Sequence, residues 1–325
     1  MKPYLRVFTA ILAVCLLGTG CLSAHPATEG SFERTLSVSG QVDLDVVTGS
    51  GNIDVRAVGG STVRVRALIR ARDLFGMSAA EKVRYIESHP PIEQTGNVIR
   101  IGRFEDREYT RNVTISYELD VPPDTRLKAR SGSGNVTAGG LNGTIEMNSG
   151  SGNVRASNIG GEVRAQTGSG NVEIDSVRGN LQAGTGSGNI RAQGIGGGLR
   201  AHSGSGSVHA EQTAPGDADL ETGSGNIDAV GVRGGLRART GSGRIDVGGE
   251  PSGGWTVNAG SGNVTIRLKS EAAFDLYAHT SSGHVRLDHP VTVTGTVSAK
   301  ELRGKVRGGG PLVEAHTGSG DILVQ

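Results

Sequence analysis

Residues 152–167 read Gly-Asn-Val-Arg-Ala-Ser-Asn-Ile-Gly-Gly-Glu-Val-Arg-Ala-Gln-Thr, and the architecture of the chain follows from this pattern. The stretch contains two Val-Arg-Ala segments nine residues apart, each bounded by glycines. Apolar and polar residues alternate within each segment, which predicts a short strand with one buried face. The glycines predict turns, and we expect them to take positive φ angles, which only Gly and to a lesser degree Asn adopt at little cost.

The turn motif of this stretch repeats along the chain. Gly-Ser-Gly preceded by Thr, Ser or Ala ends at Gly51, Gly134, Gly152, Gly170, Gly188, Gly206, Gly225, Gly243 and Gly262, and returns at Gly320 after a Ser-Ser-Gly variant at Gly283. From Gly134 onward the intervals are 18, 18, 18, 18, 19, 18, 19, 21 and 37 residues. We expect the last interval to hold two repeats, with a degenerate turn at Arg303-Gly304. Such a regular period indicates stacked structural units.

The composition excludes other glycine-rich classes. The chain has 54 glycines in 325 residues, but they do not fall at every third position as in collagen. The 33 basic and 32 acidic residues leave a net charge of +1, which favours neither a disordered chain nor a nucleic-acid partner. Both cysteines lie in the first 21 residues, which excludes a disulfide scaffold.

Two short strands cannot bury an apolar face alone, whereas stacked units pair at about 4.8 Å and enclose a continuous core. The sequence therefore predicts an all-β fold, a single-stranded β-solenoid in the form of a flattened β-helix or β-roll with about 18 residues per coil. Larger aliphatic residues form one inward column, in which we place Leu236 and Val257, and alanines form another. We expect the Thr or Ser before each turn to stack as a hydroxyl ladder and the Asn after it as an amide ladder.

The solenoid is expected over residues 36–325, with a short helix-containing insertion near the N-terminus, at about residues 73–97. Residues 78–88 predict a helix, because Ser78 followed three residues later by Glu81 is a capping-box pattern. We expect this excursion to cover the end of the stack, since an open edge strand invites pairing. Residues 25–35 are expected to form a linker.

The first 24 residues predict a signal peptide. Lys2 and Arg6 precede an apolar run at residues 7–17, which is too short to span a bilayer but suits a secretory segment. Cleavage after Ala24 is one alternative. The other is lipidation of Cys21, which ends a Gly-Thr-Gly-Cys lipoprotein-like box and would be the only cysteine of the mature chain. Either route predicts export.

A family resemblance rests on two features. Residues 117–122 read Tyr-Glu-Leu-Asp-Val-Pro, and the Thr-Gly-Ser-Gly-Asn-Val/Ile turns follow them. This combination resembles the bacterial putative-adhesin family of cell-envelope β-solenoids, a family of unknown function, over about residues 36–325. The chain differs from the commonest pattern of that family in having Asn rather than Asp after most turn glycines, although Asp321 keeps the acid. The resemblance implies the fold and an exported location.

Metal ligation is not expected. A calcium roll needs carboxylates in its turns, yet the corresponding column holds mostly Asn, with Ser207, Arg244, His284 and a single Asp321. His202, His279 and His316 share an outward column that zinc could use. By repeat count the first two lie four coils apart, and His279 and His316 lie two coils apart, about 10 Å.

Catalytic and cofactor residues are not expected either. The outward charges alternate in sign without clustering, which suits solvated cross-strand pairs, and the serines occupy turns. The arginines from Arg164 to Arg239 form a mildly basic stripe that we interpret as solvated surface. Exposed aromatic residues often bind glycans, but we expect Trp255 and Phe274 to fill the core and only Tyr277 to face outward.

The sequence favours a non-enzymatic exported protein of the cell envelope, whether periplasmic, outer-membrane-anchored or on the cell surface. It would act as an adhesin-like binding or scaffold protein, with an envelope glycan or another envelope protein as partner, and would contact the membrane only through a lipid anchor. The alternatives are a carbohydrate-active lyase or hydrolase built on a β-helix, and a polymer-forming structural solenoid. Residues 322–325 end in mid-strand, so we expect this end to pair with a partner or to be covered by loops near Trp255.

Overall fold

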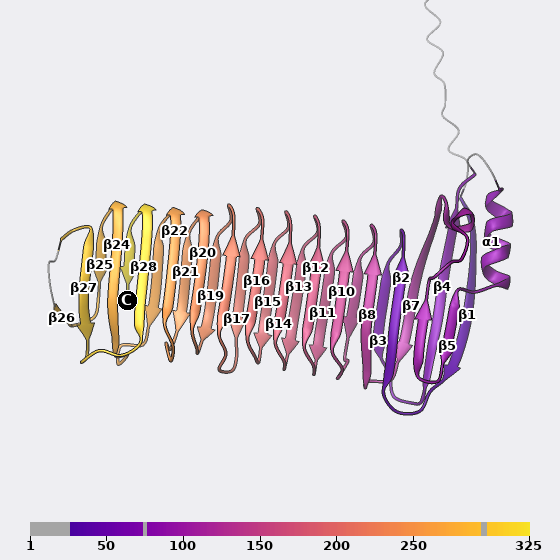
Figure 1. The fold of residues 1–325 in the computed structure, drawn as a ribbon, viewed down its shortest axis with the longest axis horizontal. Helices are drawn as coiled ribbons and strands as arrows, with labels where there is room; N and C mark the ends of the chain where they lie inside the picture. Colours follow the sequence, from indigo (N-terminus) through magenta and orange to yellow (C-terminus); the bar gives the residue numbers. More distant parts are fainter. Residues whose placement is uncertain (1–26, 74–76, 294–297) are drawn as a thin grey trace, which may run out of the picture.

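The protein is a long stack of β-strands, drawn in Figure 1. The computed structural model describes residues 27–73, 77–293 and 298–325; the predicted signal peptide and Cys21 lie outside them. The described residues contain 29 strands in a 14-stranded and a 15-stranded sheet, with one short α-helix. The inward side chains of the two sheets form one hydrophobic cluster, as the predicted flattened β-solenoid requires.

Each interior coil places one strand in each sheet. The interior strands of the 15-stranded sheet are β8 (Thr125–Ser131), β10 (Ile145–Ser149), β12 (Val163–Thr167), β14 (Leu181–Thr185), β16 (Leu199–Ser203), β18 (Ala218–Thr222), β20 (Leu236–Ser242) and β22 (Trp255–Ser261). Those of the 14-stranded sheet are β9 (Val136–Gly139), β11 (Val154–Ile159), β13 (Val172–Val177), β15 (Ile190–Ile195), β17 (Val208–Gln212), β19 (Ile227–Val232), β21 (Ile245–Gly249) and β23 (Val264–Leu268). Neighbouring coils pair in parallel, so that Ile145 lies beside Val163 and Val163 beside Leu181.

The inward columns follow the predicted alternation with one shift in register. Leu236 pairs with Trp255 rather than with Val257, which lies beside Ala238 in the alanine column. The predicted column placed Val257 21 residues after Leu236, whereas the interval here, from Gly243 to Gly262, is 19 residues, which puts Trp255 beside Leu236. Trp255 and Phe274 are both fully buried, as predicted.

The corner built by each Gly-Ser-Gly or Ser-Ser-Gly motif, which we call the glycine corner, takes the predicted positive φ only in the coils near the two ends, at Gly51 (152°), Gly243 (154°), Gly262 (143°), Gly283 (158°) and Gly320 (141°). The φ angle of Gly170 lies outside the +20° to +160° region, so the expected positive φ is wrong there. A Cβ on Gly170 would instead stand 2.1 Å from the carbonyl oxygen of Gly152 in the preceding coil. Interior coils take φ angles near +60° at the opposite corner instead, at Asn158 (54°), Ser176 (59°) and Gly194 (65°).

Side chains at the glycine corner bond to the backbone of the adjacent coil. The Thr167 hydroxyl donates to the carbonyl of Gly152 at 2.7 Å and accepts from the N–H of Gly170 at 3.3 Å. The N–H of Asn171 donates to Oδ1 of Asn153 at 2.8 Å. The predicted hydroxyl and amide ladders therefore exist, and each rung ties a side chain to backbone groups.

The first coil lies out of chain order. Its strands are β2 (Val42–Thr48) and β3 (Ile53–Ala57). In the 15-stranded sheet, β2 lies between β6 (Val98–Ile101) and β8, and in the 14-stranded sheet β3 lies between β7 (Val113–Val121) and β9. Later segments of the chain therefore close this end of the stack.

A helix and an antiparallel pair of strands complete the N-terminal end (Figure 1). Helix α1 (Ala79–Ser88) begins with the predicted Ser78–Glu81 capping box and buries Val83 and Ile86. It packs on β1 (Thr28–Ser37) and β4 (Thr62–Ala71), as expected of a cover. The remaining elements here are β5 (Ile92–Thr95), which pairs with β6, and the 3-10 helix η1 (Arg107–Thr110).

Two predicted boundaries at this end need correction. The predicted linker at residues 25–35 is wrong for residues 28–35, which belong to β1. Phe32 is the only buried residue of this edge strand, and its neighbours on the same side, Gly30 and Leu36, are half-buried, so the apolar alternation is weaker than in other strands. The insertion at about 73–97 ends earlier than predicted, because β5 already belongs to the 15-stranded sheet.

The last coil is also out of order. Its strands β28 (Leu312–Ser319) and β29 (Ile322–Val324) lie between the coil β22–β23 and the coil of β24 (Phe274–Ser282) and β25 (Val285–Leu287). The predicted turn at Arg303-Gly304 is wrong, since both residues lie in β27 (Glu301–Val306), which runs antiparallel to β24 and to β26 (Val291–Val293). The expected partner or loop cover for residues 322–325 is also wrong, because β29 pairs with β23 on one side and β25 on the other. No helix in the described part of the chain is both long and apolar enough to cross a membrane.

Candidate functional site

The outer face of the 15-stranded sheet carries the groove that we consider first as a binding surface. Its side chains form two columns that run along the stack. The first column, in spatial order, is Lys128, Glu146, Arg164, Gln182, Arg200, Asp219, Arg237, Thr256, Glu314, Tyr277 and Arg303. Tyr277 and Glu314 exchange places relative to the chain order, because β28 lies between β22 and β24.

A shallow groove of about 740 Å³ crosses this face between β12 and β22. Most charged side chains in and beside the groove have partners. Arg200 lies 3.3 Å from Asp219, and His202 lies 3.7 Å from Glu221. Asp217, at the edge of the groove, accepts a hydrogen bond from the N–H of Gly235 at 2.7 Å. These three carboxylates therefore form contacts within the sheet and are not free to bind a ligand.

Two arginines of the groove are different. Among the described residues, neither Arg237 nor Arg239 has a carboxylate within 4.0 Å. Arg237 is exposed, whereas Arg239 is half-buried and its Nε has no hydrogen-bond partner in the described part of the chain. Unpaired guanidinium groups in a groove favour an acidic partner, because they can bind its carboxylate or phosphate oxygens with two parallel hydrogen bonds. The basic stripe that we interpreted as solvated surface thus contains the best candidate contacts.

An aromatic and histidine patch adjoins this column near the C-terminal end. The Tyr277 ring meets the His316 ring edge-on at 5.2 Å, and Nε2 of His316 lies 3.0 Å from Oε1 of Glu314. Tyr277 faces outward, as predicted. The expected spacing of two coils between His279 and His316 is wrong, since they lie on adjacent strands with ring centres 6.3 Å apart. The out-of-order last coil brings them together, and no regular repeat count could show it.

The second outward column of this face runs through His202, Glu221, Arg239, Asn258, His316 and His279, so His202 lies four strands from His316. The described residues contain no group of three or more His, Cys, Asp or Glu side chains that could hold a metal ion. The column after the glycine corners, where a calcium roll has its ligands, is engaged in backbone hydrogen bonds. Ser207 accepts from the N–H of Asn226, and Asp321 accepts from the N–H of His284.

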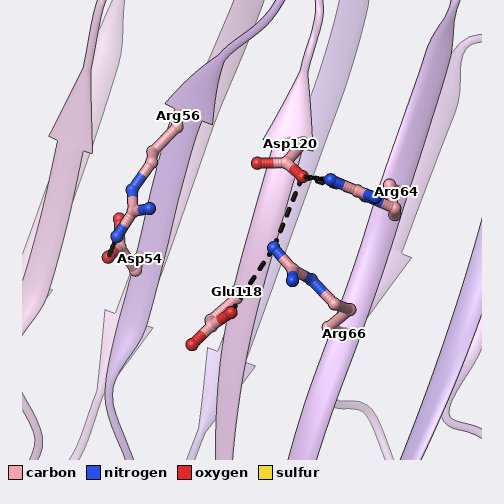
Figure 2. A network of polar contacts seen from close by, with 6 residues as sticks. All are labelled: Asp54, Arg56, Arg64, Arg66, Glu118 and Asp120. Carbon is pink, nitrogen blue, oxygen red and sulfur yellow. Dashed lines mark hydrogen bonds and ion pairs between the residues drawn. The ribbon is translucent and has the colours of Figure 1, made fainter.

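The outer face of the 14-stranded sheet has a different character, which Figure 2 shows near its N-terminal end. Arg64 and Arg66 both contact Asp120, and Arg66 also lies 3.5 Å from Glu118. The hydrogen bond from Arg64 to Asp120 and the charge of that carboxylate raise the pKa of Arg64. Because the charges here neutralise one another, this face suits a solvated surface better than a ligand site.

Cys21, the one site residue that the sequence predicts, lies outside the described residues. Sequence reasoning identified the outward columns but missed the importance of Arg237 and Arg239. The signal was available in part, because Arg239 falls in register between Glu221 and Asn258. Whether a carboxylate comes within reach of a guanidinium depends on side-chain geometry, which register alone does not give.

Comparison with known proteins gives one family and several solved structures. The Toastrack DUF4097 family matches residues 161–325, half of the chain. The chain is similar to a "putative cell adhesion protein" of Clostridium sporogenes, with 11% identity over 91% of this chain and 99% of that one and a TM-score of 0.23. It is also similar to a "putative lipid binding protein" of Parabacteroides distasonis (13% identity, 91% and 96% covered, TM-score 0.42). A "putative adhesin" of Bacteroides fragilis gives 14% identity, 91% and 97% coverage and a TM-score of 0.32. No curated protein matches the sequence.

Proposed function

The chain belongs to the Toastrack DUF4097 family, and from that premise we propose that it is a non-enzymatic, exported β-solenoid of the cell envelope. It acts as an adhesin-like binding or scaffold protein, and its partner is an envelope glycan that carries acidic groups. The observation that carries this proposal is the pair of unpaired arginines, Arg237 and Arg239, in the groove of the 15-stranded sheet.

The coil architecture supports a binding role for this face. Backbone and side-chain ladders hold every coil in register, so the outward columns keep a spacing of about 4.8 Å along the stack. A rigid row of this kind loses little conformational entropy when an extended polymer binds along it. Tyr277 and His316 continue the surface beyond the groove and offer ring faces and edges to sugar units.

The non-enzymatic assignment is supported by the carboxylates of the groove. Glycoside hydrolysis usually needs two carboxyl groups that face the same sugar bond. Asp219 instead pairs with Arg200, and Asp217 accepts from a backbone N–H of the next coil, which leaves Glu162 as the one groove carboxylate without such a contact among the described residues. The polymer-forming alternative is disfavoured by both ends of the stack, since α1 covers one end and the antiparallel strands β26 and β27 close the other (Figure 1).

The binding test uses purified envelope polysaccharide and peptidoglycan from the native cells in a sedimentation assay. We expect the double variant Arg237→Gln, Arg239→Gln to bind the acidic glycan at least about tenfold more weakly than the unchanged protein. The matched control is Arg191→Gln, Arg286→Gln, which removes two arginines without ion pairs from the 14-stranded sheet. Equal loss in both double variants would point to non-specific charge attraction. Release of new sugar ends would show a carbohydrate-active enzyme.

Export is supported by Lys2 and Arg6 before the apolar run at residues 7–17. Mass spectrometry of the mature protein from its native cells tests it and separates the two routes. A lipid-modified Cys21 means an anchored envelope protein, and a free N-terminus at His25 means a protein that diffuses after export. An intact Met1 would contradict export.

A further inference from the structure

A second cleft lies at the N-terminal end of the stack, away from the groove. Its volume is about 1180 Å³, and it opens beside the glycine corner of the first coil. Segments far apart in the sequence form its walls: residues 47–50, 102–104, Thr110 and 112–115, together with Ala27, where the described chain begins. The excursion of the chain after β4 builds this cleft, and no interior coil repeats it.

The cleft is strongly basic. Arg70, Arg72, Arg103 and Arg130 line it, and none of its lining residues is acidic. Two carboxylates reach these arginines from outside the lining. Glu29 lies 2.8 Å from Arg70, and Asp45 lies 2.7 Å from Arg103 and 3.6 Å from Arg130.

Arg72 has no ion pair in the described part of the chain. Four guanidinium groups against two carboxylates leave an excess of two positive charges at this site.

A buried tyrosine whose hydroxyl is unpartnered within the described ranges is among the residues that line the cleft. Tyr117 lines it and is 1% exposed, and its OH has no hydrogen-bond partner among the described residues. The OH lies 3.3 Å from the point where a Cβ on Gly102, another lining residue, would stand. A buried hydroxyl without a hydrogen-bond partner destabilises the folded protein. A bound group that accepts its hydrogen bond would remove that cost.

We propose that this cleft binds a phosphate group, presented either by the headgroup of an anionic lipid or by a soluble phosphate ester. Arginine forks bind phosphate oxygens with paired hydrogen bonds, and the Tyr117 hydroxyl donates a further one. A phosphate monoester carries a charge of about −1.5 to −2 at neutral pH and a phosphodiester headgroup about −1, so the excess of two positive charges can neutralise either group. Phe104, Val113 and Ile115 also line the cleft and suit the apolar part of such a ligand.

The test measures binding of the mature protein to glycerol 3-phosphate by calorimetry and to vesicles by sedimentation. Vesicles of phosphatidylglycerol are compared with vesicles of phosphatidylcholine, which report any binding through a lipidated N-terminus. The variants are Arg72→Gln, which removes the guanidinium without an ion pair, and Tyr117→Phe, which removes only the hydroxyl. Arg56→Gln is the control, because Arg56 is an exposed arginine of β3 that pairs with Asp54 and does not line the cleft (Figure 2).

We expect Arg72→Gln and Tyr117→Phe each to weaken binding about tenfold, while Arg56→Gln leaves it unchanged. Binding of glycerol 3-phosphate identifies the phosphate group itself as sufficient, and binding only to phosphatidylglycerol vesicles identifies the lipid headgroup as its source. Two outcomes would overturn the proposal. One is the absence of binding to both probes, and the other is an equal loss in all three variants. The groove variants at Arg237 and Arg239 should not change this binding, so the two proposals can fail separately.

Discussion

Oδ1 of Asn153 accepts a hydrogen bond from the backbone N–H of Asn171, the equivalent residue of the next coil, at 2.8 Å. Asn171 accepts in the same way from Asn189, and Asn189 from Ser207. Each link uses only a side-chain acceptor and a backbone donor. This explains why Ser207 and Asp321 can replace Asn without interrupting the ladder. The column in which a calcium roll would place its ligands is thus part of the frame that holds the coils in register.

Removal of one rung should therefore destabilise the stack. We expect Asn153→Ala to lower the free energy of unfolding by about 1–3 kcal/mol, because the N–H of Asn171 loses its acceptor at a half-buried position. Asn153→Asp keeps the acceptor and should change stability much less. Urea denaturation followed by circular dichroism compares them. Equal losses in both variants would show that the amide group acts through its NH₂ and not through Oδ1.

The glycine corner makes a sharper prediction. We expect Gly170→Ala to cost about 1–3 kcal/mol, because its Cβ would stand 2.1 Å from the Gly152 carbonyl and the stacked turns must separate. Gly49 occupies the first position of the same motif in the first coil, where a Cβ would meet no atom within 4 Å. Gly49→Ala is the matched control and should shift the melting temperature little. A tolerated Gly170→Ala would refute the close-approach explanation.

The opposite corner predicts a gain in stability. Ser176 has a φ of 59°, a region that costs a non-glycine residue about 1–2 kcal/mol. Ser176→Gly relieves this cost but adds about 0.5–1 kcal/mol of chain entropy in the unfolded state. We therefore expect Ser176→Gly to raise the melting temperature slightly above that of the unchanged protein. Ser157→Gly, one coil earlier and outside that φ region, should lower it. A change of melting temperature in the same direction for both substitutions would contradict the positive φ assigned to Ser176.

Burial of Tyr117 predicts a loss of stability at alkaline pH. Burial raises the pKa of its hydroxyl well above the usual value near 10, which the unfolded chain keeps. The unfolded state therefore releases this proton first, so stability is complete below about pH 10 and falls as the pH rises above it. We expect the slope to be up to about 1.4 kcal/mol per pH unit from this residue. In denaturation series from pH 8 to about pH 11.5, the Tyr117→Phe variant should lose less stability with rising pH than the unchanged protein. Parallel plots of stability against pH for the two proteins would contradict this prediction.

The last coil can be tested with the single tryptophan of the chain. Trp255 is fully buried and pairs with Val313 of β28. Removal of residues 312–325 should expose it and shift its emission to longer wavelengths, because β22 and β24 then lose the coil between them.

The control deletes one interior coil, residues 163–180, and leaves Glu162 to precede Leu181. The flanking coils can pair directly, so we expect the emission of Trp255 to stay unchanged. An unshifted emission after the tail is removed would mean that the coils β22 and β24 close the gap by themselves.

The repeated part of the fold could be predicted from sequence because each coil pairs with its neighbour in the chain. Spacing gave the coil length, alternation gave the buried faces, and Ser78 with Glu81 gave the helix start. The order of coils at the ends could not be predicted. All strands share one pattern, so nothing local distinguishes β22 from β24 as the partner of Val313.

The candidate sites likewise divide into features that the repeat predicts and features that depend on the order of the coils. The outward columns, and the outward position of Tyr277, could be predicted from the alternation within each repeat. The basic cleft is not, because it joins Arg72, Arg103 and Arg130 from segments whose contacts depend on the out-of-order first coil. Whether an arginine such as Arg239 finds a carboxylate is settled by distances within the folded sheet.

The out-of-order ends also constrain the sequence in which the chain can fold. The first coil, β2–β3, leads the rest of the solenoid along the chain, yet its neighbours β6 and β8 lie between residues 98 and 131. During synthesis, which proceeds from the N-terminus, this coil therefore cannot pair until the segments that hold β6 and β8 have been made. Interior coils face no such delay, since each partner arrives about one repeat later and loop closure is short. We expect folding to begin in the middle of the stack and to spread outward, with the two terminal coils locking into place last.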